Sequence, residues 1–123
     1  MNDQSVLIVE DDKWLAEQYA RVLNLAGYKT DISLHALAAI QAVDDNRPDV
    51  IILDVLLSGS TAITLLNELQ SYGDTSKIPI ILCTNLASEI SIDDMEPYGV
   101  RKILNKATMM PDDLTSAVKS VLL

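Results

Sequence analysis

The sequence contains few of the residues that form disulfides, transition-metal sites or membrane spans. It has one cysteine and one histidine, so Cys83 has no partner for an internal disulfide and His35 has no second histidine for a transition-metal site. No apolar run approaches the ~18 residues of a membrane helix, since even residues 50–57 are interrupted by Asp54. The first residues have neither the basic region nor the apolar stretch of a signal peptide, so we expect a cytoplasmic protein.

Basic residues are also scarce. Nine lysines and arginines face eighteen aspartates and glutamates, which gives a formal net charge of −9. Such a surface repels nucleic acid and anionic membranes, so we expect neither as a direct partner of this chain. A cation or a basic protein partner suits this charge better.

The length and composition indicate one globular domain. The chain has 123 residues, of which 49% are hydrophobic and 22% are charged. A chain of this size buries roughly two thirds of its unfolded surface, and no stretch has the composition of a linker. We therefore expect a single domain over residues 1–123.

Short apolar runs alternate with longer segments of helical period, a pattern typical of repeated βα units around a parallel sheet. The strands are expected at residues 6–9, 28–32, 50–53, 78–83 and 100–104. The second strand is the most polar, which favours a place at the sheet edge. Asp12 and Ser33 are expected to cap the first two helices, Gly27 to end the first, and Pro111 to open the last.

The helical segments differ in the strength of their apolar faces. The residues expected to face inward are Leu15, Tyr19, Val22 and Ala26 in the first helix; Leu37, Ile40 and Val43 in the second; Ile63, Leu66 and Leu69 in the third; and Leu114, Ala117, Val118 and Val121 in the last. Residues 88–96 carry four acids and lead into a proline, so we expect a short, weakly anchored fourth helix there.

Polar side chains collect where the strands end. The residues that follow the first, third, fourth and fifth strands are Glu10, Asp11 and Asp12; Asp54; Thr84 and Asn85; and Asn105 and Lys106. In an open parallel sheet these positions share one edge, where ligands bind. Hard oxygen ligands suit Mg²⁺, while a lysine and a hydroxyl suit phosphoryl oxygens. This collection also gives a reason for placing a charged residue, Asp54, directly after a buried strand.

Four stretches together resemble the receiver domain of two-component response regulators. They are VLIVEDD at 6–12, DVIILDVLLSG at 49–59, IPIILCTN at 78–85 and GVRKILNKA at 99–107, and they occur in the order and at the separations of that family. The resemblance covers the whole chain. It implies a flavodoxin-like, doubly wound α/β fold of five βα units with strand order 2-1-3-4-5.

The same resemblance implies a phosphorylation site. Asp54 would be the phosphoacceptor, Thr84 would contact a phosphoryl oxygen, and Lys106 would pair with the aspartate or its phosphate. Mg²⁺ would be held by the metal ligands Glu10, Asp11, Asp54 and the main-chain carbonyl of Leu56. The donor would be a histidine kinase or a histidine phosphotransfer protein, and an output protein would dock near the fourth helix, fifth strand and fifth helix. The domain would catalyse only its own phosphorylation and dephosphorylation.

The chain departs from the family pattern at five positions. Ser58 and Ala107 stand where prolines are common, Ala62 where a glycine is common, Asn85 where a small residue is usual, and Ile103 where an aromatic switch residue is usual. None of these changes removes a group that phosphoryl transfer needs. They bear on how a signal leaves the domain.

Two other functions fit parts of the pattern. A receiver-like module that binds partners without being phosphorylated is compatible with Ile103 and Ala107. A phosphatase of the haloacid dehalogenase type also uses a strand-end aspartate, a threonine and a lysine. That class needs a second acid two residues after the nucleophile, where this chain has Leu56.

Overall fold

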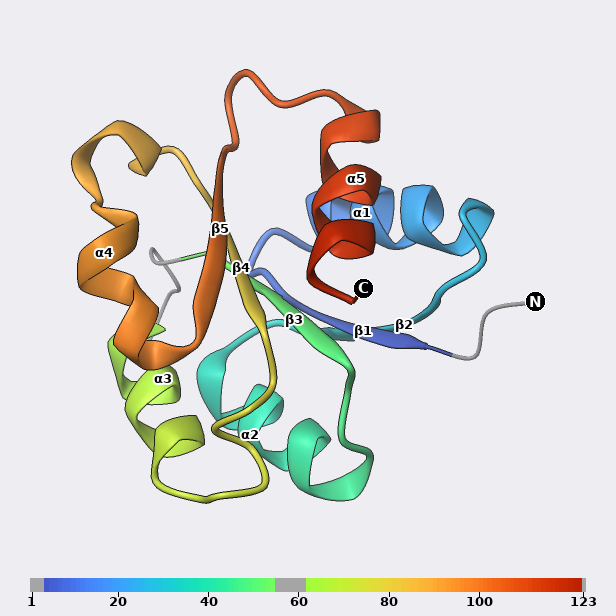
Figure 1. The fold of residues 1–123 in the computed structure, drawn as a ribbon. Coiled ribbons are helices and arrows are strands. Elements are labelled where there is room, and N and C mark those ends of the chain that lie inside the picture. Colours follow the sequence, from blue (N-terminus) through green and yellow to red (C-terminus); the bar gives the residue numbers. More distant parts are fainter. Residues whose placement is uncertain (1–3, 55–61, 123) are drawn as a thin grey trace.

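Five parallel strands run through the centre of the molecule, with helices on both faces (Figure 1). The computed structural model describes residues 4–54 and 62–122. The strands are β1 (Ser5–Val9), β2 (Lys29–Ser33), β3 (Val50–Leu53), β4 (Ile80–Thr84) and β5 (Val100–Asn105). They are arranged in the order β2-β1-β3-β4-β5, which confirms the predicted topology and places β2 at an edge.

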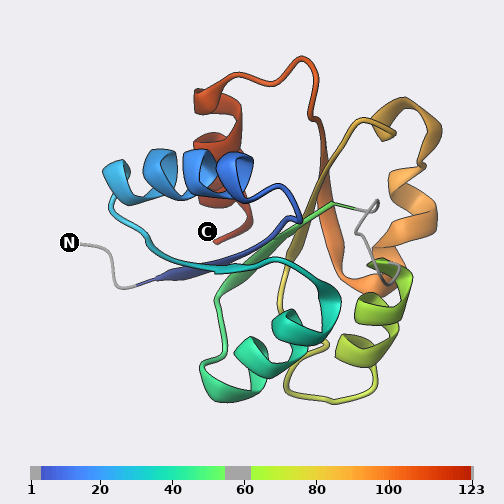
Figure 2. The same cartoon turned by 180° about the vertical axis from the view of Figure 1, so that it is seen from behind.

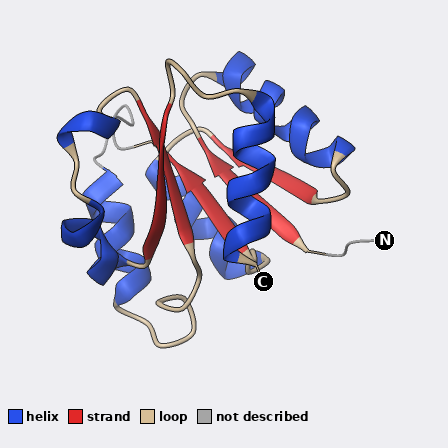
Figure 3. Cartoon of the chain, turned by 45° about the horizontal axis from the view of Figure 1, so that its top comes forward, coloured by secondary structure: helices blue, strands red, loops and turns tan. Residues whose placement is uncertain are grey.

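The helices form two layers. They are α1 (Lys13–Leu25), α2 (Ala36–Asp45), α3 (Ala62–Gln70), α4 (Ile92–Met95) and α5 (Pro111–Val121), and single 3₁₀ turns lie on either side of α4, at Ala87–Glu89 and Glu96–Tyr98. One core cluster joins the sheet to α1 and α5, and a second joins the opposite face to α2, α3 and α4. Figure 2 shows the same layers from behind, and Figure 3 shows the sheet between them. No helix among the described residues has the length and apolar character needed to cross a membrane.

The central strand β3 is enclosed on every side. All four of its residues are buried, and it pairs with β1 on one side and β4 on the other. An unbroken apolar run is what a strand covered on both faces requires. The predicted bounds of β3 are confirmed, whereas β4 begins at Ile80, two residues later than predicted, just after Pro79, which has no N–H to donate.

The two ends of α1 are as predicted, and Tyr19 is buried as predicted, but the other residues of the predicted inward face are not fully buried. The Asp12 side chain accepts a hydrogen bond from the Leu15 N–H at 3.1 Å, and Gly27 adopts a positive φ of 98° just past the C-cap. The buried residues are Ala16, Tyr19, Ala20 and Leu23. Leu15 and Val22 are only half-buried and Ala26 is exposed, so the predicted face is rotated by one position.

The prediction that Ser33 caps α2 is wrong. Ser33 is the last residue of β2, paired in register with Val9, and the cap is His35, whose Nδ1 accepts from the Ala38 N–H at 3.2 Å. The later start turns the helix, so that Ala36, Ala39 and Val43 are buried, while the side chain of Leu37, predicted to face inward, is 62% exposed. His35 is exposed, as expected for a residue at a helix end.

The last three helices follow the predictions more closely. In α3 the buried residues are Ala62, Leu65, Leu66 and Leu69, whereas Ile63 is exposed, contrary to prediction. The fourth helix is a single turn with one buried residue, Met95, which confirms a short and weakly anchored element. Pro111 is the first residue of α5, with Leu114, Ala117 and Val118 buried and Val121 half-buried, as predicted.

Candidate functional site

The register of the sheet brings four predicted site residues to one edge. Val9 pairs with Leu53, Leu53 with Leu82, and Thr84 with Asn105. The residues at or just after these strand ends are Glu10, Asp54, Thr84 and Lys106. The ends of parallel strands therefore meet as the sequence predicted.

A lysine ammonium lies between two carboxylates at this edge. The Nζ atom of Lys106 is 2.5 Å from Oδ2 of Asp54 and 2.5 Å from Oε1 of Glu10. Only 14% of the Lys106 side chain is exposed, against 7% for Asp54 and 3% for Glu10. Charges this well removed from water are tolerated only when they are paired, and here one cation serves two anions.

Burial and ion pairing shift the pKa values of Glu10 and Lys106 in opposite directions. Burial raises the pKa of Glu10, although Lys106 and the Asp12 N–H both act to lower it. For Lys106 burial acts to lower the pKa, but the hydrogen bonds and charges of Asp54 and Glu10 outweigh burial, so its pKa is raised. Two carboxylates contact the Lys106 ammonium, so it stays charged at neutral pH.

The three acidic residues after β1 differ in their contacts and exposure. The backbone N–H of Glu10 donates to the Ser33 carbonyl at 3.1 Å, and Oε2 of Glu10 accepts from the Asp12 N–H at 3.1 Å. Asp12 in turn caps α1, and Asp11 is exposed. A helix cap needs one acid, so Glu10 and Asp11 remain for another role.

Thr84 lies on the other side of the lysine and is fully buried. Its hydroxyl accepts a hydrogen bond from the Leu86 N–H at 3.2 Å, and its carbonyl accepts from the Lys106 N–H at 3.0 Å. The hydroxyl therefore supports the turn after β4. The carbonyl fixes the backbone from which the Lys106 side chain extends.

The remaining predicted positions are placed as follows. Leu56 and Ser58 lie outside the described residues. Ala62 is buried at the start of α3, Asn85 is exposed, and Ile103 is half-buried against the core cluster of α2 and α3. The Lys106–Ala107 peptide is trans.

The donor atoms at this edge suit a hard cation. Oxygen atoms from two carboxylates converge on one positive charge, and oxygen is the ligand that Mg²⁺ prefers. Within residues 4–54 and 62–122, no group of three or more His, Cys, Asp or Glu side chains is already arranged as a metal site. The described residues thus supply a cation-binding pair, with the exposed Asp11 directly after Glu10 in the chain.

Two features of this region were not predicted from the sequence. One is the ion pair of Glu10 with Lys106, for which the signal was the position of Glu10 directly after a fully buried run. The other is a buried contact behind the site, where the Cys83 sulfur lies 3.3 Å from the Met109 sulfur and 3.6 Å from the Tyr19 hydroxyl. Cys83 itself is buried.

Several curated proteins are similar to this chain in sequence. The transcriptional regulatory protein BaeR of Escherichia coli is 31% identical over 113 residues, which cover 84% of this chain and 46% of BaeR. The phosphate regulon transcriptional regulatory protein PhoB of Pseudomonas aeruginosa is 30% identical over 122 residues, covering 99% of this chain and 53% of PhoB. The chain spans about a third to a half of the length of the curated relatives it matches.

Solved structures agree with the fold. A putative response regulator from Chloroflexus aurantiacus superposes with a TM-score of 0.83 at 31% identity, over 98% of both chains. The chemotaxis protein CheY4 of Vibrio cholerae superposes with a TM-score of 0.85 at 23% identity, over 98% of this chain and 100% of CheY4, and supports the fold alone. The family described as the response regulator receiver domain matches residues 6–119. The chain therefore belongs to the response regulator receiver family of two-component signalling.

Proposed function

We propose that this domain is a phosphorylation-controlled switch that accepts a phosphoryl group on Asp54 from a histidine kinase or a histidine phosphotransfer protein. The observation that carries the proposal is the Lys106 ammonium, which contacts Asp54 Oδ2 at the carboxyl edge of the sheet in a chain of the receiver family. Asp54 is nearly buried at the end of a rigid strand, and its N–H donates to the Val9 carbonyl at 3.4 Å. A carboxylate held in this way is oriented for in-line attack.

In the transfer step a carboxylate oxygen of Asp54 attacks the phosphorus of a phosphohistidine. The new P–O bond makes an acyl phosphate, and the P–N bond of the donor breaks with its electron pair returning to the imidazole nitrogen. Lys106 stabilises the negative charge on the oxygens during transfer, and Thr84 offers its hydroxyl to a phosphoryl oxygen. Attack of water on the same phosphorus releases phosphate and restores Asp54, so the domain acts catalytically only on itself.

We propose that Mg²⁺ is the cofactor, bound by Glu10, Asp11, Asp54 and the carbonyl of Leu56, the last of which lies outside the described residues. When bound, Mg²⁺ would supply positive charge to the phosphoryl oxygens. The support for this site is the pair of carboxylates that already converge on one cation. When Mg²⁺ is bound, Glu10 would contact the metal in place of the ammonium, and Lys106 would keep its contact with Asp54.

We further propose that residues 1–123 act as one cytoplasmic receiver domain that does not itself bind nucleic acid or membrane. The output partner is expected on the surface of α4, β5 and α5. Support comes from α4, a single turn with one buried residue and an exposed Ile92, because an element with few core contacts rearranges at low cost. The net charge of −9 favours a partner with a basic surface.

Intact mass measures the proposed reaction directly. After incubation with Mg²⁺ and acetyl phosphate, the protein should gain the mass of one phosphoryl group, and Asp54→Asn should abolish the gain because it removes the nucleophile. Asp45→Asn, at the exposed end of α2, is the matched control and should gain the group normally. An unchanged mass with acetyl phosphate and with a panel of histidine kinases would instead indicate an interaction module that is not phosphorylated.

A further inference from the structure

The segment between β5 and α5 carries Lys106 at its start (Figure 1). The Lys106 N–H is the last backbone group tied to β4. The next three N–H groups all bond to Asn105: that of Ala107 to its side-chain oxygen at 3.0 Å, and those of Thr108 and Met109 to its carbonyl at 3.2 and 2.9 Å. These bonds shape the turn, and the Met110 N–H, which donates to Asp113 Oδ2 at 2.7 Å, ties the far end of the segment to α5.

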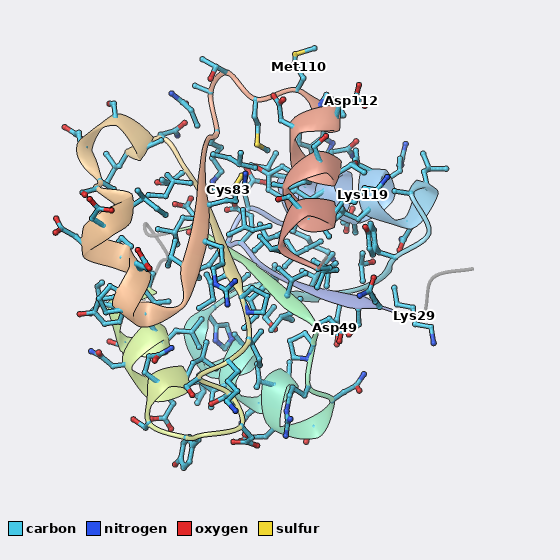
Figure 4. The ribbon with its side chains drawn as sticks, in the orientation of Figure 1. Lys29, Asp49, Cys83, Met110, Asp112 and Lys119 are labelled. Carbon is cyan, nitrogen blue, oxygen red and sulfur yellow. The ribbon has the colours of Figure 1, made fainter. Side chains whose placement is uncertain are left out.

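One side chain of residues 107–110 enters the core. Ala107, Thr108 and Met110 are exposed, whereas Met109 is half-buried and packs against the cluster under α1 and α5. Its sulfur lies 3.3 Å from the sulfur of Cys83, a residue that is 1% exposed. Figure 4 shows Cys83 in the interior and Met110 at the outer end of the segment.

The Cys83 thiol that Met109 contacts is uncharged at neutral pH. Burial raises the pKa of Cys83 to about 11, so the thiol stays protonated at neutral pH. The Tyr19 hydroxyl, on α1, lies 3.6 Å from the same sulfur. Met109 thus packs on the neutral Cys83 thiol of β4, which the Tyr19 hydroxyl of α1 contacts in turn, and sulfur atoms adapt well to such irregular sites.

A cleft of about 180 Å³ lies beside this contact. Its walls include Leu15, Tyr19, Lys106, Met109 and Leu114. Lys106 and Met109 therefore share one space between α1 and α5. If the side chain at position 109 were shorter, the segment would have room to move, and no proline at position 107 restricts its backbone.

We propose that Met109 is a positioning residue that holds the Lys106 ammonium against Asp54 by anchoring the β5–α5 segment on Cys83. Met109 does not touch the reacting atoms. Its effect on phosphoryl transfer rests on the function proposed above, whereas its effect on the place of Lys106 does not.

The test compares Met109→Ala and Met109→Leu with two controls. Met110→Ala removes the same side chain from the exposed neighbour, which is 65% exposed, and Val118→Ala opens the same core cluster from α5. The first readout is the ¹⁵N signal of the Lys106 ammonium in the protein without metal. The second is the rate of phosphorylation by acetyl phosphate in Mg²⁺, measured over a range of donor concentrations.

Met109→Ala should shift or broaden the Lys106 signal and lower the maximal rate about ten- to hundredfold, because small displacements of a catalytic group cost this much. The half-saturating donor concentration should not change. Met109→Leu should keep the wild-type Lys106 signal and the wild-type rate, since leucine fills a volume similar to that of methionine. Both controls should behave like the wild type.

The proposal is overturned if Met109→Ala keeps the wild-type Lys106 signal and rate, or if Val118→Ala lowers the rate equally. Should Met109→Ala fail to fold, Met109→Val, which removes less volume, takes its place under the same criteria. If the wild type gains no phosphoryl group, the proposed function fails, while the ammonium signal still decides whether Met109 places Lys106.

Discussion

Two ion-pair sites lie at opposite edges of the same sheet. At the carboxyl edge Lys106 bridges Glu10 and Asp54, with 14%, 3% and 7% of the side chains exposed. At the amino edge Arg47, before β3, pairs with Asp74, before β4, at 2.8 Å, with 54% and 57% exposed. The contact lengths are similar, but the access of water is not.

The exposure of an ion pair determines how much the stability of the protein depends on it. The exposed pair keeps most of its hydration, so forming it changes the free energy of unfolding little. The buried groups have lost their hydration, so removing one partner leaves an unpaired charge in the protein interior. The stability of the protein should therefore depend strongly on the ion pairs at the carboxyl edge and only weakly on the ion pair at the amino edge.

The largest effect is expected from Lys106→Met. Without divalent cation, this change leaves two buried carboxylates facing each other and should lower the free energy of unfolding by about 3–5 kcal/mol in urea titrations. Mg²⁺ should recover part of the loss by replacing the missing charge. Lys102→Met, which replaces an exposed lysine on β5, is the control. A loss below about 1 kcal/mol for Lys106→Met would place this site in the class of the Arg47 pair.

The reactivity of Cys83 tests how well water is excluded from the core next to the buried ion pairs. Its pKa is raised from 9.0 to about 11 by burial, so at pH 8 the thiolate should be roughly a hundredfold rarer than in the unfolded chain. Its reaction with a disulfide reagent should therefore be slower by at least that factor than in urea. Equal rates would mean that water reaches this layer.

The same shift of the Cys83 pKa predicts a loss of stability in alkali. The folded state holds the thiol proton more tightly, so the stabilisation is complete below about pH 9 and is lost as pH rises toward 11. Urea titrations across this range should show a smaller decrease for Cys83→Ala than for the wild type. An identical decrease in both proteins would assign the alkaline loss to other groups.

Thr75→Val tests how much a buried but uncharged hydrogen bond at the amino edge contributes to stability. The Thr75 hydroxyl is buried and donates to the Leu69 carbonyl at 2.6 Å, in the last turn of α3. Losing this donor should lower the free energy of unfolding by about 1–3 kcal/mol. Ser71→Ala, whose exposed hydroxyl bonds to Asn67, should change it by less than about 0.5 kcal/mol. Equal effects would show that burial is not the deciding variable.

Arg47→Ala should have the smallest effect. The pair with Asp74 is exposed, so its loss should cost less than about 1 kcal/mol and nothing measurable at high salt. A double-mutant cycle with Asp74→Ala isolates the interaction. A coupling energy above about 2 kcal/mol would contradict the contrast between the two edges.

Strands were easier to predict than helix faces, and the reason is the role of alanine. The run of β3 is apolar at every position, so its bounds follow from the sequence. In α1, α2 and α3 the inward positions include Ala16, Ala39 and Ala62, while larger residues such as Leu37 and Ile63 point outward. Alanine carries little hydrophobic signal, yet it fits where a helix lies against a sheet, so periodicity of large residues alone misplaced these faces.

The site was predictable as a set of residues but not as a set of contacts. Parallel strands end at one edge, so the nearness of Asp54 and Lys106 followed from their places in the sequence. The second contact of Lys106, with Glu10, depends on side-chain reach and burial, which strand order does not encode. The anchoring of Met109 on Cys83 also depends on packing. The metal ligation by Asp11 and Leu56 stays a prediction.

The separation of Glu10, Asp54 and Lys106 along the chain has a consequence for biosynthesis. A ribosome adds roughly 5–20 residues per second from the N-terminus, so both carboxylates emerge well before the ammonium does. Until β5 joins β4, nothing from that strand balances the two negative charges at the centre of the sheet. A nascent chain therefore gains its last strand and the cation that balances Glu10 and Asp54 in the same event.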